Sequence, residues 1–238
     1  MNLVTKPKAQ PAEQGGRRLY GRRKGHSLSP RRLQLIETLL PELRIDLSVD
    51  APSDPADLLD GPVGQVWLEI GFGAGEHLAW QAARNPRVGI LGSEAFINGI
   101  ATLLVSIESE NLTNVRIHDG DARDLLDWLP DAGLARIFVL FPDPWPKKRH
   151  RRRRLFSAAT VAQLARVLRP GGELRAATDI GDYARAILLA MQDEPAFKWT
   201  ARRASDWRER APDWPQTRYE QKALREGRTP YFLTFERV

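Results

Sequence analysis

Short apolar runs alternate with segments of helical periodicity from residue 65 to the end of the chain. The apolar runs predict strands over residues 66–70, 88–92, 115–117, 135–140, 173–177 and 231–235. Apolar residues at helical spacing predict helices between them, over residues 75–83, 96–108, 155–168 and 181–192. Strands that alternate with helices predict an α/β fold, in which a mostly parallel sheet carries helices on both faces and ligands bind at the carboxyl ends of the strands.

The chain before residue 65 has a different pattern. Residues 1–30 have almost no apolar periodicity, which predicts a flexible basic arm. Ser29-Pro30 is typical of a helix start, and apolar residues at helical spacing predict a helix over 30–47. Residues 50–64 hold three prolines and two glycines, so they predict a linker.

These patterns divide the chain into two expected parts. We expect a basic N-terminal arm with a helical extension over 1–60, followed by one α/β domain over 61–238. The sequence has no run of 18 apolar residues, and its N-terminus has no apolar segment of the signal-peptide type. We therefore expect a cytoplasmic protein with no membrane partner.

The composition excludes several kinds of site. The 238 residues include no cysteine, which excludes a disulfide scaffold, a thiol nucleophile, an iron–sulfur cluster and cysteine-based zinc sites. The four histidines are scattered without the spacing of metal ligands. We therefore expect no metal site.

The positive charge is concentrated in two short segments. The net charge is +6, but residues 1–24 alone hold seven basic residues and one acid, and residues 147–154 hold seven basic residues and no acid. The rest of the chain is acidic. This segregation favours a polyanionic partner such as nucleic acid, although a run of like charge is also typical of a solvated or disordered stretch.

A glycine loop closes the first predicted strand of the α/β domain and opens the next helix. Gly71, Gly73 and Gly75 let the chain turn tightly and let a ligand approach the backbone. The spacing is G-x-G-x-G, and Glu76 follows, so the loop departs from the dinucleotide fingerprint, whose pyrophosphate disfavours a nearby acid. The alternative is a tight strand-to-helix turn with no ligand.

Acidic residues stand at the ends of successive predicted strands. Glu69 precedes the glycines and suits a cationic amine, Glu94 follows the second strand and can accept both hydroxyls of a ribose, and Asp121 follows the third and can meet an adenine edge. Because carboxyl ends of parallel strands meet at one edge of the sheet, these acids and glycines predict an adenosine site without phosphates. S-adenosyl-L-methionine has a ribose, an adenine and an ammonium but no phosphate, and so fits this site.

The run Phe141-Pro142-Asp143-Pro144-Trp145-Pro146 follows the strand predicted over 135–140. The prolines restrict the backbone around Asp143, and Trp145 offers a flat surface on which a base can stack. A carboxylate beside an aromatic ring suits guanine, because it accepts from the ring NH and the amino group. The basic run 147–154 follows at once and favours phosphate contact. The alternatives are a rigid turn whose aspartate caps the next helix, and a basic run that is merely solvated.

Taken together, these motifs resemble the bacterial tRNA (guanine-N(7)-)-methyltransferase family. The motifs are LEIGFGAGEH, GDA, FPDPWPKKRHRRRR, RPGG, Thr178-Asp179 and Thr217-Arg218-Tyr219-Glu220. The resemblance spans roughly residues 60–238, and FPDPWPKKRH and the T-x-[FY]-E motif are its strongly specific parts. It implies a Rossmann-like S-adenosylmethionine-dependent methyltransferase fold with a seven-stranded, mostly parallel sheet. It also implies methyl transfer to ring nitrogen 7 of a guanine in the variable loop of tRNA.

The resemblance also implies roles for individual residues. Contacts to S-adenosyl-L-methionine are implied for Glu69, Glu94, Asp121 and Asp143, beside the glycine loop, and Asp143 is also implied as the catalytic residue. Substrate contacts are implied for Lys147, Asp179, Thr217, Arg218, Tyr219 and Glu220. tRNA is then the expected partner of a monomer or homodimer, with no obligate protein partner evident.

Three other functions remain open at this stage. The first is a methyltransferase that acts on an amine of a protein or small molecule, which the basic runs disfavour. The second is a nicotinamide-dependent oxidoreductase, which Glu76 disfavours. The third is a non-catalytic RNA-binding module, which does not need the acids of an adenosine site.

Overall fold

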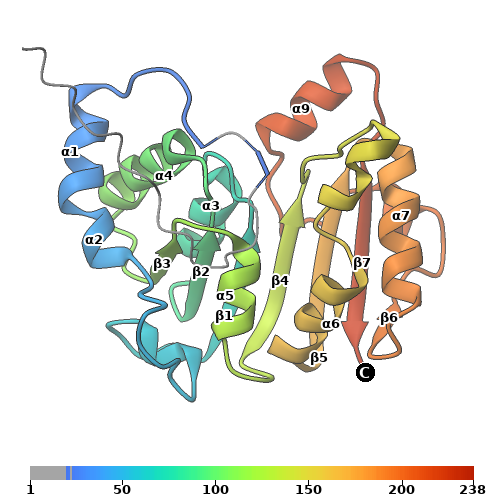
Figure 1. The fold of residues 1–238 in the computed structure, drawn as a ribbon, viewed down its shortest axis with the longest axis horizontal. Helices are drawn as coiled ribbons and strands as arrows, with labels where there is room; N and C mark the ends of the chain where they lie inside the picture. The colour runs from blue at the N-terminus through green and yellow to red at the C-terminus, as the bar shows by residue number, and fades with distance from the viewer. Residues whose placement is uncertain (1–19, 22) are drawn as a thin grey trace, which may run out of the picture.

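The computed structural model describes residues 20, 21 and 23–238, and its sheet has seven strands in the order β3-β2-β1-β4-β5-β7-β6. The strands are β1 (Gln65–Ile70), β2 (Val88–Ser93), β3 (Val115–His118), β4 (Leu134–Leu140), β5 (Leu168–Thr178), β6 (Phe197–Trp199) and β7 (Tyr231–Arg237). β7 pairs antiparallel with β5 and β6, whereas the other pairs are parallel. The expected α/β fold with a seven-stranded, mostly parallel sheet is confirmed (Figure 1).

Helices connect the parallel strands and cover the sheet. The α-helices are α1 (Pro30–Thr38), α2 (Leu40–Leu43), α3 (Glu76–Arg84), α4 (Ile97–Glu110), α5 (Ala122–Trp128), α6 (Ala158–Val167), α7 (Gly181–Gln192), α8 (Ser205–Arg208) and α9 (Arg218–Arg225). Two short 3-10 helices are η1 (Pro55–Leu58) and η2 (Lys148–Arg153). In the part of the chain that the structure describes, no helix combines the length and the apolar character needed to cross a membrane.

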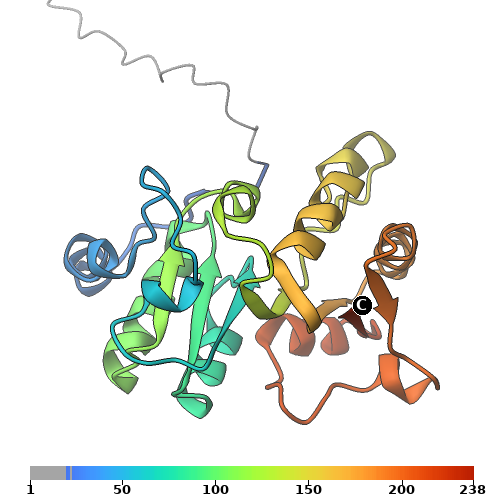
Figure 2. The same ribbon diagram turned by 90° about the horizontal axis from the view of Figure 1, so that it is seen from below.

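Each face of the sheet has its own apolar core. Successive side chains of a strand point to opposite faces, so Leu68 of β1 packs with Leu125 of α5 and Leu164 of α6, whereas Trp67 joins the cluster of α3 and α4. The helices that cover the two faces lie on either side of the sheet when the molecule is turned (Figures 1 and 2). β1 and β2 are buried almost throughout, which explains why they read as continuous apolar runs.

The single helix predicted over 30–47 is wrong, because the segment forms two helices and then an extended stretch. Pro41 has no N–H to donate to an earlier carbonyl, and the chain turns at Leu39 before α2 begins. After α2, the backbone N–H of Ile45 donates to the carbonyl of Ile117 at 2.8 Å, at the edge of β3. Apolar residues of both helices are buried in the same cluster as α4. The division of the chain at residue 60 stays a prediction.

Several short elements are absent from the sequence prediction. β6 has three residues, α5 buries only Leu125 and Leu126, and α9 buries only Glu220 and Ala223, so none of them has a long apolar pattern. The linker predicted over 50–64 contains η1, which Asp54 caps through the N–H of Ala56. The strand predicted over 173–177 begins earlier, at Leu168, and residues 169–172 of the RPGG motif form a bulge inside β5, because Leu168 already pairs with Leu134 and pairing resumes at Glu173.

Candidate active site

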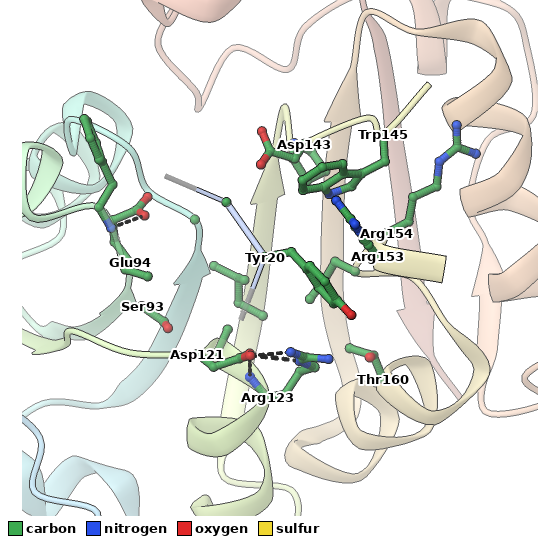
Figure 3. Close-up of a pocket in the computed structure, with 18 of the residues that line it drawn as sticks. Tyr20, Ser93, Glu94, Asp121, Arg123, Asp143, Trp145, Arg153, Arg154 and Thr160 are labelled. Atoms are coloured by element: carbon green, nitrogen blue, oxygen red, sulfur yellow. Dashed lines mark hydrogen bonds and ion pairs between the residues drawn. The ribbon is translucent and has the colours of Figure 1, made fainter. Parts of the chain in front are cut away.

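A cavity of about 480 Å³ opens at the carboxyl ends of the parallel strands. Its walls come from the glycine loop, the end of β2, the start of α5, the segment after β4 and the chain around Tyr20 (Figure 3). The residues with predicted roles that line it are Gly71, Gly73, Glu94, Asp121, Asp143, Trp145, Tyr219 and, from the basic run, Arg152, Arg153 and Arg154. Its volume is typical of cavities that hold small ligands and cofactors.

The glycine loop has backbone conformations that favour glycine. Gly71, Gly73 and Gly75 have φ values of 71°, 58° and 77°. A Cβ on Gly71 would have no neighbour within 4 Å, whereas one on Gly75 would lie 2.6 Å from a methyl carbon of Leu103. Gly71 therefore leaves room for a ligand at the cavity, and Gly75 is required for close packing of the loop on α4.

The Glu94 carboxylate is built into the cavity wall. One oxygen accepts from the backbone N–H of Gly73 at 2.8 Å and the other from that of Phe96 at 2.9 Å. Burial raises the pKa of Glu94, although these backbone hydrogen bonds act in the opposite direction. Glu94 therefore fixes the glycine loop against the end of β2, and each oxygen keeps a lone pair for a further donor.

Asp121 has a structural role as well as a place in the cavity wall. Its carboxylate caps α5 by accepting from the backbone N–H of Arg123 at 3.0 Å and forms an ion pair with the Arg123 guanidinium. Arg123 also lines the cavity, and Figure 3 shows the pair beneath Tyr20. The predicted contact of Asp121 to an adenine stays a prediction.

Glu69 lies apart from the other predicted cofactor residues. Because it alternates with Leu68 and Ile70, its side chain points toward α3, where it is 3% exposed and 2.7 Å from Nδ1 of His77. It borders a second cavity of about 20 Å³ between the glycine loop and Tyr219 and does not line the large one. The sequence analysis did not identify His77 as a partner of Glu69. Their i, i+8 relation across a strand end and a helix start is the only sequence signal for it.

Asp143 is held on a strained segment. The two residues that bracket it, Phe141 and Trp145, have φ values of 51° and 40°, a region that side chains other than glycine rarely adopt. Such conformations cost about 1–3 kcal/mol each and persist where the surrounding structure enforces them. The alternative of a helix cap is wrong, because Lys147 and Ser157 occupy the capping positions of the next two helices.

The carboxylate of Asp143 has no hydrogen-bond donor among the residues that the structure describes. Its side chain is exposed at the mouth of the cavity, and partial desolvation by the surrounding protein raises the pKa of Asp143 above the ordinary value. Figure 3 shows it opposite Glu94, beside the indole of Trp145. A partly desolvated carboxylate that lacks donors from the described chain has full capacity to accept hydrogen bonds from a ligand.

The basic run divides into inward-facing and outward-facing residues. Arg152, Arg153 and Arg154 line the cavity. The Arg153 guanidinium lies 4.5 Å from the centroid of the Tyr20 ring and 4.9 Å from that of Trp145, so it bridges two aromatic rings. The run therefore has residues that form the cavity wall as well as residues that face away from it. The phosphate contact that the sequence predicts for the run stays a prediction.

Of the six residues with predicted substrate contacts, one lines the large cavity. Tyr219 lines the large cavity, next to Gly73, and is 48% exposed. Thr217 caps α9 by accepting from the backbone N–H of Glu220, whose buried carboxylate pairs with Arg210. Like Thr217 and Glu220, the remaining three do not line that cavity: the backbone N–H of Arg218 donates to Glu76, Asp179 pairs with Arg228, and Lys147 immediately precedes η2.

Tyr20 is the main cavity residue that the sequence analysis missed. It belongs to the segment predicted as a flexible arm, of which residues 1–19 and 22 lie outside the described part. Farther along, the carbonyl of Arg23 accepts from the N–H of Ile97, and the N–H of Gly25 donates to Asn98 at 2.7 Å. The end of the arm is therefore fixed to α4. An aromatic residue within a basic stretch was the available signal.

Known proteins resemble this chain over most of its length. A family model of methyltransferases, Methyltransf_4, matches residues 64–233. A tRNA (guanine-N(7)-)-methyltransferase of Nitrobacter hamburgensis is 50% identical over 225 residues, which cover 94% of this chain and 88% of that protein. The protein of the same name from Rhodospirillum rubrum is 49% identical over 223 residues, with 92% and 88% covered.

A solved structure described as an antibiotic-related methyltransferase has a TM-score of 0.55 with this chain at 14% identity, and the match covers 80% of this chain and 96% of that one. At this identity the likeness shows the fold alone, which is the Rossmann-like fold of methyltransferases. The family follows from sequence identity, since about half of the residues agree with each relative along more than nine-tenths of the chain. The protein belongs to the tRNA (guanine-N(7)-)-methyltransferase family.

Proposed function

We propose that this protein transfers a methyl group from S-adenosyl-L-methionine to ring nitrogen 7 of a guanine in the variable loop of tRNA. Its family supports the reaction type and the substrate. The observation that carries the proposal for the site is the Asp143 carboxylate, which faces the cavity, is partly desolvated, and has no donor from the described chain. It is the group best prepared to receive hydrogen bonds from a base.

The cavity fits this methyl donor on three counts. Its volume of about 480 Å³ accommodates a nucleoside with a short side chain. The open space at Gly71 lets a ligand reach the backbone. Carboxylates suit the ribose hydroxyls and the cationic groups of the cofactor, and they disfavour a phosphate.

Individual residues would hold the cofactor and present the base. Glu94 would accept from the ribose hydroxyls with the lone pairs that its backbone donors leave, and Asp121 would meet the adenine edge. Gly71, Gly73 and Gly75 would shape the loop around the bound molecule. Glu69, beside His77 under that loop, would contribute its negative charge near the cationic amine of the cofactor. When bound, S-adenosylmethionine supplies a methyl group on a positively charged sulfur.

Alignment of the two reactants is then the main catalytic contribution of the chain. Nitrogen 7 of guanine has an exposed lone pair and no proton, so the reaction needs no strong base. Holding reactants in line contributes of order 7–11 kcal/mol. Asp143 would accept from the ring NH and the amino group of guanine, and its negative charge would offset the positive charge that develops on the methylated base.

Contacts to the rest of the tRNA would come from two segments. Lys147 and the outward-facing residues of the basic run would approach phosphates, and Asp179 with the segment Thr217, Arg218, Tyr219 and Glu220 would frame the substrate on the other side of the cavity. Such binding weakens as salt rises, because it releases counterions. We further propose that the protein acts in the cytoplasm, as a monomer or a homodimer.

Methyl transfer to unmodified tRNA tests this function. We expect labelled methyl groups to appear on a variable-loop guanine at nitrogen 7, and a transcript in which that guanine is replaced by adenine to accept none. Bulk protein and small amines serve as competing acceptors. Methylation of those acceptors alone, or of another base in tRNA, would contradict the proposal.

A further inference from the structure

The strained segment around Asp143 needs an anchor at each end. At its upstream end, the backbone N–H of Phe141 donates to the carbonyl of Ala177 at 2.7 Å and continues the sheet. Downstream, the residues at 142, 144 and 146 are prolines, which have no N–H. A backbone donor is therefore missing at these three positions, so a hydrogen bond to a carbonyl is the way to hold the downstream end.

Arg154 makes this hydrogen bond. Its Nε donates to the carbonyl oxygen of Pro144 at 2.8 Å, between Asp143 and the strained Trp145. Its Nη2 lies 2.6 Å from a carboxylate oxygen of Asp182, and its guanidinium carbon lies 4.7 Å from the centroid of the Tyr183 ring. One planar side chain thus joins the segment after β4 to the first turn of α7.

The surroundings of Arg154 are those of an internal anchor. Its side chain is 8% exposed, whereas Arg149 of the same run is exposed to solvent and contacts the neighbouring His150 at 3.3 Å. Burial raises the pKa of Tyr183 to about 12, so the ring beneath Arg154 stays uncharged. The hydroxyl of the same tyrosine accepts from the backbone N–H of Leu155 at 3.3 Å.

We propose that Arg154 is a positioning residue, which holds the Pro144 carbonyl and thereby keeps the Asp143 carboxylate directed at the reacting base. This inference rests on the proposed role of Asp143. It separates Arg154 from the rest of the basic run: the outward-facing residues contribute to tRNA affinity, and Arg154 contributes to turnover through its neighbour. A displacement of about 1 Å at a reacting group can cost about 100-fold in rate.

Steady-state kinetics with tRNA on Arg154→Gln and Arg149→Gln test the assignment. For Arg154→Gln we expect kcat at saturating cofactor and tRNA to fall about 10–100-fold, while the KM for tRNA and the slope of its affinity with salt stay within about twofold of wild type. For Arg149→Gln the loss is expected in the KM for tRNA, and the salt slope should fall by about 1. A raised KM and an unchanged kcat for Arg154→Gln would overturn the proposal.

Two conservative variants cover the case in which Arg154→Gln does not fold. Arg154→Lys can reach either the Pro144 carbonyl or Asp182 but lacks the planar fork for both, so part of the kcat should return. Asp182→Asn weakens the other arm of the anchor, and we expect a smaller fall in kcat. Wild-type kcat in both variants would refute the assignment.

A double-mutant cycle shows whether Arg154 acts through Asp143. In an Asp143→Asn background, Arg154→Gln should lower kcat by less than about threefold further, because the group that it positions is already lost. Full additivity of the two losses would contradict the inference. Failure of the proposed function would differ from both results, since the wild-type protein itself would then leave tRNA unmethylated.

Discussion

Glu94 and Asp143 are carboxylates on opposite walls of one cavity, and they differ in their hydrogen bonds to the rest of the protein. Glu94 accepts hydrogen bonds from two backbone N–H groups, which fix its position before any ligand arrives. Asp143 receives no such bond from the described residues, and burial alone shifts its pKa. From this contrast we infer different proposed roles: Glu94 would form part of a preformed binding wall, and Asp143 would accept hydrogen bonds from the substrate.

The backbone around the two carboxylates differs in the same direction. The loop beside Glu94 reaches positive φ at glycines, which adopt it without strain. The segment around Asp143 reaches positive φ at Phe141 and Trp145, at a cost of about 1–3 kcal/mol each. Strain of this kind is found at functional sites, where the rest of the fold compensates for it.

The largest expected effect comes from Asp143→Asn. We expect kcat to fall about 100–1000-fold, because the neutral amide neither accepts from two guanine donors nor offsets the charge on the base. Cofactor affinity by calorimetry should change less than about threefold. Asp131→Asn, at the opposite edge of the sheet, is the matched control. A wild-type kcat in Asp143→Asn would mean that the Asp143 carboxylate has no catalytic role that distinguishes it from Glu94.

Glu94→Gln should have a smaller effect of a different kind. An amide is a weaker acceptor of the ribose hydroxyls than a carboxylate, at a cost of about 1–2 kcal/mol, so the cofactor dissociation constant should rise about 5–30-fold. At saturating cofactor, kcat should stay within about threefold of wild type. Glu110→Gln, on the exposed end of α4, serves as the control in the same calorimetric titration. An unchanged dissociation constant would mean that Glu94 only supports the loop.

The smallest effect, and the one that sharpens the comparison, is the dependence on pH. Burial raises the pKa of Asp143 and of Glu94, and their ionised forms are the ones that act. The rate should therefore fall with decreasing pH at a higher pH than for a free carboxyl group. In Asp143→Asn, the acid limb of kcat should flatten, whereas that of cofactor binding should remain. An identical acid limb of kcat in the variant would exclude Asp143 as its source.

The raised pKa values of Asp143 and Glu94 affect stability and the reaction in opposite directions, because the reaction needs the ionised forms and folding favours the protonated ones. A carboxyl group whose pKa is higher in the folded state than in the unfolded state favours folding when it is protonated, and this contribution is lost as pH rises through the folded pKa. The ionised forms of Asp143 and Glu94, which the proposed reaction uses, are therefore unfavourable for folding at neutral pH. Consistent with this, we expect thermal unfolding of Asp143→Asn at neutral pH to occur at or above the wild-type temperature.

The long elements of the fold were predictable because their patterns come from burial on both faces. β1, β2 and β4 are mostly apolar and mostly buried, since helices cover both sides of the sheet. β6 and α9 were not, because β6 is three residues long and α9 is mostly charged. What holds such elements is contact with distant parts of the chain, as where the N–H of Arg218 donates to Glu76.

The site was predictable to the same extent and for a similar reason. Residues that follow parallel strands meet at one edge of the sheet, so Glu94, Asp121 and Asp143 could be brought together from their positions in the sequence. Glu69 could not be placed in this way, because strand alternation turns its side chain toward His77. Tyr20 was not predicted either, because its one sequence signal, an aromatic residue within a basic stretch, does not show that it lies near Trp145.

The sequence by itself determined the α/β order of the elements, the glycine loop, the acids at the strand ends and the family. These properties depend on local periodicity, on backbone sterics and on residue identity, all of which the linear order of residues carries. The tertiary structure alone decided which carboxylates are already satisfied by the protein and which arginine faces inward. Hydrogen-bond partners and burial depend on contacts between residues far apart in the chain, and these contacts separate Asp143 from Glu94 and Arg154 from its neighbours.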